Sequence, residues 1–190
     1  MFGVPLTPRK TYGYMFNDRI TSIEEALADM REFFKTDAID GREYFFKCYY
    51  ANEPIQGRVG RNGNKAIFFE PLVANSIFLY IHSARVFYDY MMGFSDAQTA
   101  NAQFVKGVQD LEDLISHYYS GGSTFQSKFW DAAVKASNER LKRREPYQKH
   151  METYRNLYKQ GILNTGQPYG LSAHNWKLID RPLGYGNFPE

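Results

Sequence analysis

Four successive stretches with the apolar period of a helix constrain the fold of this chain most strongly. Glycine or proline bounds each stretch, as at helix ends. The inward positions predicted for the first two helices are Ile77, Tyr80, Ile81, Ala84, Phe87, Tyr88, Met91, then Phe104, Val108, Leu111, Ile115 and Tyr118. Those predicted for the third and fourth are Phe129, Ala133, Ala136 and Leu141, then Met151, Tyr154 and Tyr158. Residues 71–190 are therefore predicted to be helical, with an irregular tail.

Residues 1–70 have a different, strand-rich pattern. Residues 10–20 and 43–51 are short and aromatic, and a third run, at about 55–70, holds the tight-turn pair Asn62-Gly63. One helix is predicted at about 22–36, because Ser22 and Glu25 form a capping box before residues at helical spacing. We predict an α+β fold, in which a few antiparallel strands from a larger sheet precede a mainly helical C-terminal cap. The two parts form one structural unit.

Composition excludes several classes of protein. The 190 residues carry a net charge of +2 with 43% hydrophobic residues, which excludes a wholly disordered chain. No apolar run approaches the roughly 18 residues of a membrane helix, and the start shows no signal segment, so we expect no membrane association and a cytoplasmic location. The 15 Tyr, 15 Phe and 2 Trp must cover a core edge, a pocket or a partner.

Direct signals for catalysis are weak. The four histidines show no metal-ligand spacing, and Cys48, the single cysteine, is expected to be buried and inert in an aromatic strand. Residues 139–149 hold five basic side chains, which indicate a solvated helix face more than a phosphate-binding patch. We therefore do not expect a nucleic-acid partner. If one bound, Lys142, Arg143 and Arg144 would contact it.

The segment 63–72 is the most informative one. A glycine closes a turn, a strand follows, and Glu70-Pro71 leads into an apolar helix. Spacing alone favours a strand–helix corner, with Pro71 at a helix start and Glu70 near the positive end of the helix dipole. The alternative is a loop that presents backbone N–H groups to an anion or a flavin.

This segment resembles the G-x-x-x-x-F-[V/I/L]-E-P-L-E-S-T-[S/G]-I pattern of the flavin-dependent tryptophan halogenases. The positions in register without a gap are Gly63, Phe68, Glu70, Pro71, Leu72 and Ile77. Residues 2–6 and 13–16 are similar to part of the family's WxWxIPL motif and the strand after it. Residues 111–118 with Phe129-Trp130 are similar to its RDFIxxHY helix and SPFW step, and residues 175–179 with 183–186 to its closing motif. The four pieces lie in the family's order and span nearly the whole chain.

The resemblance implies an FAD-dependent oxidoreductase with monooxygenase-like flavin chemistry, a halide ion and halogenation of an electron-rich aromatic such as an indole. The family's catalytic glutamate falls on Val73, which cannot exchange a proton, and Glu70 is the nearby carboxylate. Implied contacts to the cofactor or the halide fall on Gly63, Pro71, Asn75 and Ser76. The implied substrate pocket includes Ala74 and Trp176, together with tyrosines of the helical part.

The family's flavin-binding half does not match any part of this sequence. The 190 residues contain neither the GxGxxG unit nor the catalytic lysine. We therefore expect a truncated, C-terminal, substrate- and tunnel-side portion that is inactive alone and retains no FAD. Its expected partners are a separate flavin-binding half or a flavin reductase, and an aromatic small molecule. The alternative is a non-enzymatic helical interaction module, so the enzyme assignment stays open.

Overall fold

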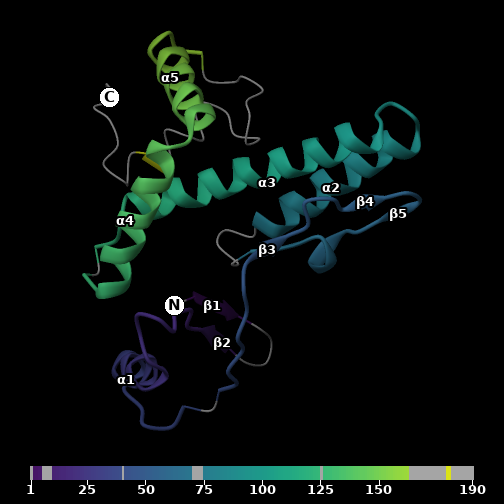
Figure 1. Cartoon of the computed structure of the whole chain (residues 1–190). Coiled ribbons are helices and arrows are strands. Elements are labelled where there is room, and N and C mark those ends of the chain that lie inside the picture. Colours follow the sequence, from purple (N-terminus) through teal and green to yellow (C-terminus); the bar gives the residue numbers. More distant parts are fainter. Residues whose placement is uncertain are drawn as a thin grey trace.

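The computed structural model describes residues 2–5, 10–39, 41–69, 75–124, 126–162 and 179–180. One antiparallel strand pair precedes the first helix, two more pairs follow it, and four further helices come after them (Figure 1). This arrangement confirms the predicted α+β class with a mainly helical C-terminal part.

The N-terminal part consists of a hairpin and one helix. Strands β1 (Phe2–Pro5) and β2 (Lys10–Gly13) pair antiparallel, and α1 (Ile23–Phe34) follows. The capping box is present: the Ser22 hydroxyl accepts from the Glu25 N–H at 3.1 Å, and the Glu25 carboxylate accepts from the Ser22 N–H at 2.8 Å. The Tyr14 hydroxyl donates to Asp29 Oδ2 at 2.6 Å, which ties the hairpin end to α1.

The central strands are two residues long each. Strand β3 (Tyr49–Tyr50) pairs with β6 (Ile67–Phe68), and β4 (Ile55–Gln56) pairs with β5 (Val59–Gly60). The 3-10 turn η1 (Gly63–Lys65) lies between β5 and β6. The predicted strand at 43–51 is therefore largely wrong, because only Tyr49–Tyr50 finds a pairing partner, and Cys48 is exposed rather than buried.

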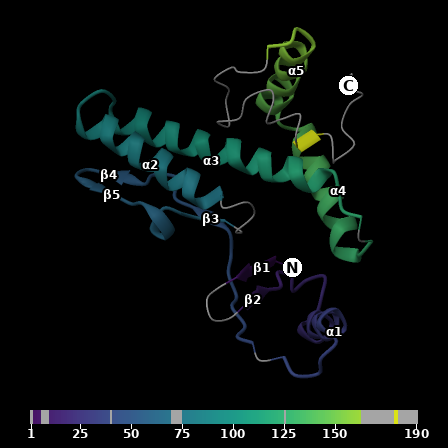
Figure 2. The same ribbon diagram turned by 180° about the vertical axis from the view of Figure 1, so that it is seen from behind.

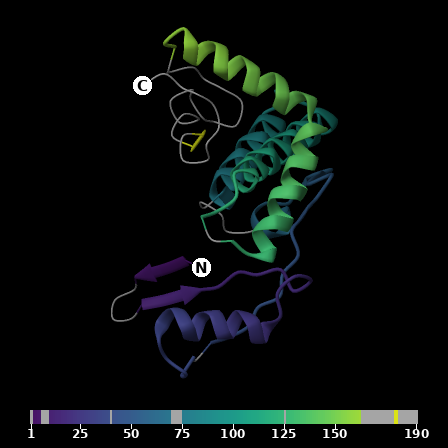
Figure 3. The ribbon, with the colours of Figure 1, turned by 90° about the vertical axis from the view of Figure 1, so that its left-hand side faces the viewer.

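The four helices of the C-terminal part are α2 (Asn75–Met91), α3 (Ala97–Ser120), α4 (Lys128–Lys142) and α5 (Glu145–Lys159). Helices α2 and α3 run antiparallel side by side, and α4 and α5 follow at the far end of α3 (Figures 1 and 2). Seen from the side, α1 and its hairpin lie at the end of the molecule opposite α5 (Figure 3). No described helix is long and apolar enough to cross a membrane.

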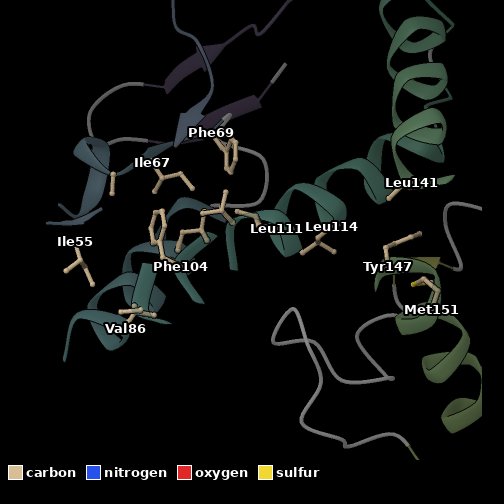
Figure 4. Close-up of a cluster of buried hydrophobic side chains, with 14 of the residues drawn as sticks. Ile55, Ile67, Phe69, Val86, Phe104, Leu111, Leu114, Leu141, Tyr147 and Met151 are labelled. Carbon is tan, nitrogen blue, oxygen red and sulfur yellow. The ribbon is translucent and has the colours of Figure 1, made fainter. Parts of the chain in front are cut away.

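One core cluster runs along α3 from the central strands to α5 (Figure 4). Its buried members are Ile55, Ala66, Ile67, Phe69, Leu79, Val86, Ala100, Phe104, Val108, Leu111, Leu114, Leu141, Tyr147, Met151 and Tyr154. The predicted inward positions on α3 and α5 are confirmed by the burial of Phe104, Val108, Leu111, Met151 and Tyr154.

The predicted inward face of α2 is largely wrong, although Tyr80 and Phe87 pack against the core as predicted. The buried residues are Leu79, Ser83 and Val86, whereas Ile77 and Ile81 are exposed. Apolar residues occur all around this helix, so its periodicity alone does not select one face. The packing of α3 and β6 against α2 decides which side is covered. On α4, Ala136 is likewise exposed although it was predicted to face inward.

We expect Phe104→Ala to lower the free energy of unfolding by about 3–5 kcal/mol, because the ring is fully buried between the central strands and α2. Urea unfolding followed by circular dichroism measures the change. The matched control, Phe45→Ala, removes a ring that is 73% exposed and should change stability by less than about 0.5 kcal/mol. Equal losses for the two variants would contradict the position of the core.

Candidate functional site

The turn, strand and helix predicted around residue 63 are all present. Gly63 begins η1 with a φ of +57°, and the side chain of Asn62 caps the turn by accepting from the Gly63 N–H at 2.7 Å. An added Cβ at Gly63 would meet no atom within 4 Å. Glycine is favoured here by the left-handed backbone conformation and not by a close neighbour.

Two tyrosines fix this turn against the rest of the protein. The Tyr49 hydroxyl donates to the backbone carbonyl of Asn64, and the Tyr80 hydroxyl donates to the Asn64 side-chain oxygen. Tyr49 belongs to β3 and Tyr80 to the second turn of α2. The turn before β6 is therefore linked to the start of α2, the helix on which the family's motif ends.

The structure describes only part of the predicted site. Asn75 is the first residue of α2, and Ser76 follows it with a half-buried side chain. The predicted residues outside the described part of the chain are Glu70, Pro71, Val73, Ala74 and Trp176. The roles assigned to these positions, and to Gly63, Asn75 and Ser76, stay predictions.

The backbone of the Gly63 turn does not fit the pyrophosphate of a flavin nucleotide. A phosphate cradle needs N–H groups that point at the ligand. Here the N–H of Gly63 donates to Asn62 Oδ1, that of Lys65 to the Asn62 carbonyl, and that of Ala66 to the Gly63 carbonyl. Three donors of the turn are thus used within it. Within the described ranges, no cluster of His, Cys, Asp or Glu is suited to hold a metal ion.

An aromatic groove lies where α3 ends and α4 begins. Tyr119, Phe129 and Trp130 contact one another, with ring centroids 5.4–6.2 Å apart. The groove beside them has a volume of about 290 Å³. Its lining residues are Asn17, Ile20, Tyr119, Phe129, Ala132, Ala133, Ala136 and Ser137.

Small side chains create the space in this groove. Alanines at 132, 133 and 136 and a serine at 137 leave the groove side of α4 shallow, while Tyr119 and Phe129 supply flat apolar walls. The sequence marked Phe129-Trp130 and the tyrosines of the helical part. It did not indicate Asn17 or Ile20, because only the tertiary structure brings the segment before α1 to α4.

Buried ion pairs and hydrogen bonds hold the helices that carry the groove. Asp113 on α3 is fully buried, and its carboxylate accepts from Arg144 at 3.0 Å and from Arg140 at 3.1 Å. Burial raises the pKa of Asp113, while the two guanidinium groups act in the opposite direction. Two members of the basic segment are thus paired with α3, so this segment is not simply a solvated face as predicted.

A second buried network connects α3, α5 and residue 180. His117 Nε2 lies 2.7 Å from Asp180 Oδ1, and His117 Nδ1 lies 2.6 Å from the Tyr147 hydroxyl. All three side chains are buried. A carboxylate only accepts, so His117 Nε2 donates to Asp180, and the second ring nitrogen forms a hydrogen bond with the Tyr147 hydroxyl. The network fixes residue 180 against the helix that ends at Tyr119 and Ser120.

The model of the tryptophan halogenase family matches residues 1–177. The match covers far more than half of the 190 residues, so the chain belongs to the tryptophan halogenase family.

Histidine 150 on α5 makes the stability of the helical part depend on pH. Burial is the main cause that lowers its pKa from 6.5 to about 4. The imidazole of His150 therefore takes up a proton near pH 6.5 in the unfolded chain, but only near pH 4 in the folded chain. The contribution of His150 to the free energy of unfolding is therefore complete above pH 6.5. It decreases by about 3 kcal/mol in total as the pH drops from 6.5 to 4.

We expect His150→Gln, which carries no charge at any pH, to flatten the loss of stability in that interval. Urea unfolding of both proteins between pH 4 and 7.5 measures the effect as the difference between two curves. The control variant is Gln148→Ala, on an exposed position of the same helix, which should keep the wild-type slope. Parallel curves for wild type and His150→Gln would contradict the assignment.

Proposed function

We propose that this chain forms the substrate-binding side of a flavin-dependent halogenase, with the aromatic groove between α3 and α4 as the place of an electron-rich aromatic substrate. The supporting observation is the groove itself: flat aromatic walls and small alanines around about 290 Å³. That volume lies at the lower end of ligand pockets and suits one small aromatic molecule such as an indole. Offset or edge-to-face contact with Tyr119 and Phe129 would hold its ring.

The flavin would come from a second polypeptide in this proposal. The 190 residues contain no GxGxxG unit, and the Gly63 turn uses three of its N–H groups internally. In such a complex, FAD would supply the oxidising chemistry, and the residues of this chain would bind and orient the aromatic ring. The purified chain alone should accordingly be colourless and inactive.

The groove assignment predicts that Ala133→Leu abolishes indole binding, because the added side chain fills the space between α4 and Tyr119. Indole titrated into the purified chain, followed by two-dimensional NMR, should shift signals around Tyr119 and Phe129 in wild type and leave them unchanged in the variant. Lys135→Leu, on an exposed position two residues further along α4, is the control and should bind as wild type does. Unaltered binding by Ala133→Leu would place the substrate elsewhere.

Because Val73 occupies the position of the family's catalytic glutamate, we expect low halogenation activity even when a flavin-binding half of a family enzyme is supplied. A positioned acid–base group usually contributes about 10²–10⁴-fold in rate, and valine cannot replace the family's glutamate. We expect Val73→Glu to increase halogenated indole, detected by mass spectrometry, by a factor within that range. Oxidation of reduced flavin should proceed equally in both proteins, since it does not need this side chain.

The control for this experiment is Val59→Glu, which adds the same carboxylate on an exposed position of β5. It should leave the rate of halogenation unchanged. Equal and efficient halogenation by the native Val73 protein and by Val73→Glu would show that this position does not limit the chemistry, and Glu70 would be the next carboxylate to test.

A second candidate function is a non-enzymatic helical interaction module. The observation that favours it is the exposed apolar side of α2, where Ile77, Ile81 and Met91 are each more than 60% exposed. An interaction module needs such a surface, whereas it needs no groove for indole. Indole binding that Ala133→Leu abolishes would favour the halogenase-like function over this one.

A further inference from the structure

We propose that the pocket between α4 and α5 binds a small phosphate monoester, with Lys142 and Arg155 holding the phosphate group. The pocket has a volume of about 140 Å³, and none of its described lining residues belongs to the aromatic groove. The proposal does not depend on the proposed function, because it concerns a separate site and a different class of ligand.

The charge of this pocket is positive and unbalanced. Lys142 at the end of α4 and Arg155 on α5 both line it, and no described aspartate or glutamate does. Neither cation forms an ion pair within the described part of the chain. The pocket therefore offers two positive charges that the described residues do not neutralise.

The other basic side chains of residues 139–149 do not serve this pocket. Arg140 and Arg144 pair with a buried carboxylate of α3, and Lys149 pairs with the carboxylate four residues before it. Arg143 is exposed and does not line the pocket. Lys142 is thus the member of this basic segment that is both placed at the pocket and left without a carboxylate partner among the described residues.

Hydrogen bonds fix the polar walls of the pocket. Tyr147 and Ser120 are each only 7% exposed. The Tyr147 hydroxyl lies 2.6 Å from His117 Nδ1, and the Ser120 hydroxyl donates to the His117 carbonyl at 2.7 Å. Asn138, which is half-buried in the lining, makes no side-chain hydrogen bond to a described residue, so its amide can donate to a phosphate oxygen. Binding therefore has to order little more than the two cations.

The remaining wall of the pocket is apolar. Leu141 and Met151 are 5% and 2% exposed and lie beside the ring of Tyr147 (Figure 4). An apolar cavity of roughly 150 Å³ accommodates benzene, so this pocket has room for a small organic group. The phosphate would lie at the open side, where Lys142 and Arg155 are exposed.

The number of cations selects the class of anion. A phosphate monoester carries a charge of about −1.5 to −2 at pH 7, whereas a carboxylate carries a single charge. The planar guanidinium of Arg155 can donate two parallel hydrogen bonds to phosphate oxygens, and the ammonium of Lys142 adds a compact charge. Two cations without carboxylate partners therefore favour a phosphate monoester over a carboxylate.

Two-dimensional NMR of the purified chain, titrated with phenyl phosphate at pH 7.5, tests the site. We expect saturable shifts of the signals around Tyr147 and Met151. Lys142→Gln and Arg155→Gln should each raise the dissociation constant about 10-fold, because each removes a charge-assisted hydrogen bond. Arg143→Gln is the matched control: it removes the same charge from the next residue, outside the pocket, and should bind as wild type does. Circular dichroism checks that each variant is folded.

Two further probes test the class of ligand. Inorganic phosphate should bind more weakly than phenyl phosphate, because it leaves Leu141 and Met151 uncovered. Benzoate should bind at least about 10-fold more weakly than phenyl phosphate, because it carries one charge. The absence of saturable shifts at Tyr147 and Met151 would overturn the proposal, as would benzoate or inorganic phosphate binding as tightly as phenyl phosphate. An equal loss of binding in Arg143→Gln would indicate a diffuse basic surface and would overturn it too.

Discussion

The packing of α3 against its neighbours is the interaction on which the rest of the structure depends. Phe104 and Val108 on its first half meet α2 and the central strands, while Leu111 and Leu114 continue the core toward α4 and α5. Helix α2, the central strands and α4 all contact this one helix. Without the burial of α3, strand pairs of two residues each would be too short to persist in water.

The second half of α3 positions the aromatic groove through charges as well as apolar contacts. The buried Asp113 pairs with Arg140 of α4 and with Arg144 at the start of α5, and His117 lies between Tyr147 and Asp180. Buried polar groups of this kind are costly unless satisfied, so their partners fix how α4 and α5 cross α3. Tyr119, which forms one wall of the aromatic groove, lies two residues after His117 on α3.

The placement of small and large apolar side chains on the helices leaves two features at the surface, the aromatic groove beside α4 and an exposed apolar side of α2. Where α4 carries alanines, a groove opens beside Tyr119 and Phe129 that suits a flat ring. Where α2 carries Ile77 and Ile81 on the side away from α3, an apolar surface stays exposed.

The sequence by itself determined several helix ends and the turn at Gly63. Ser22 with Glu25, and Gly161, mark helix ends through hydrogen bonds to nearby residues. Pro146 marks a helix start through its fixed φ, and Gly63 marks a turn through its own backbone. The covered side of α2 was decided only in the tertiary structure, because a helix that is apolar all around gives no preferred face until its neighbours are placed. The same holds for the groove, which joins residues 17 and 20 to α4 across more than 100 positions. Such contacts depend on how the helices pack, and no local pattern records that packing.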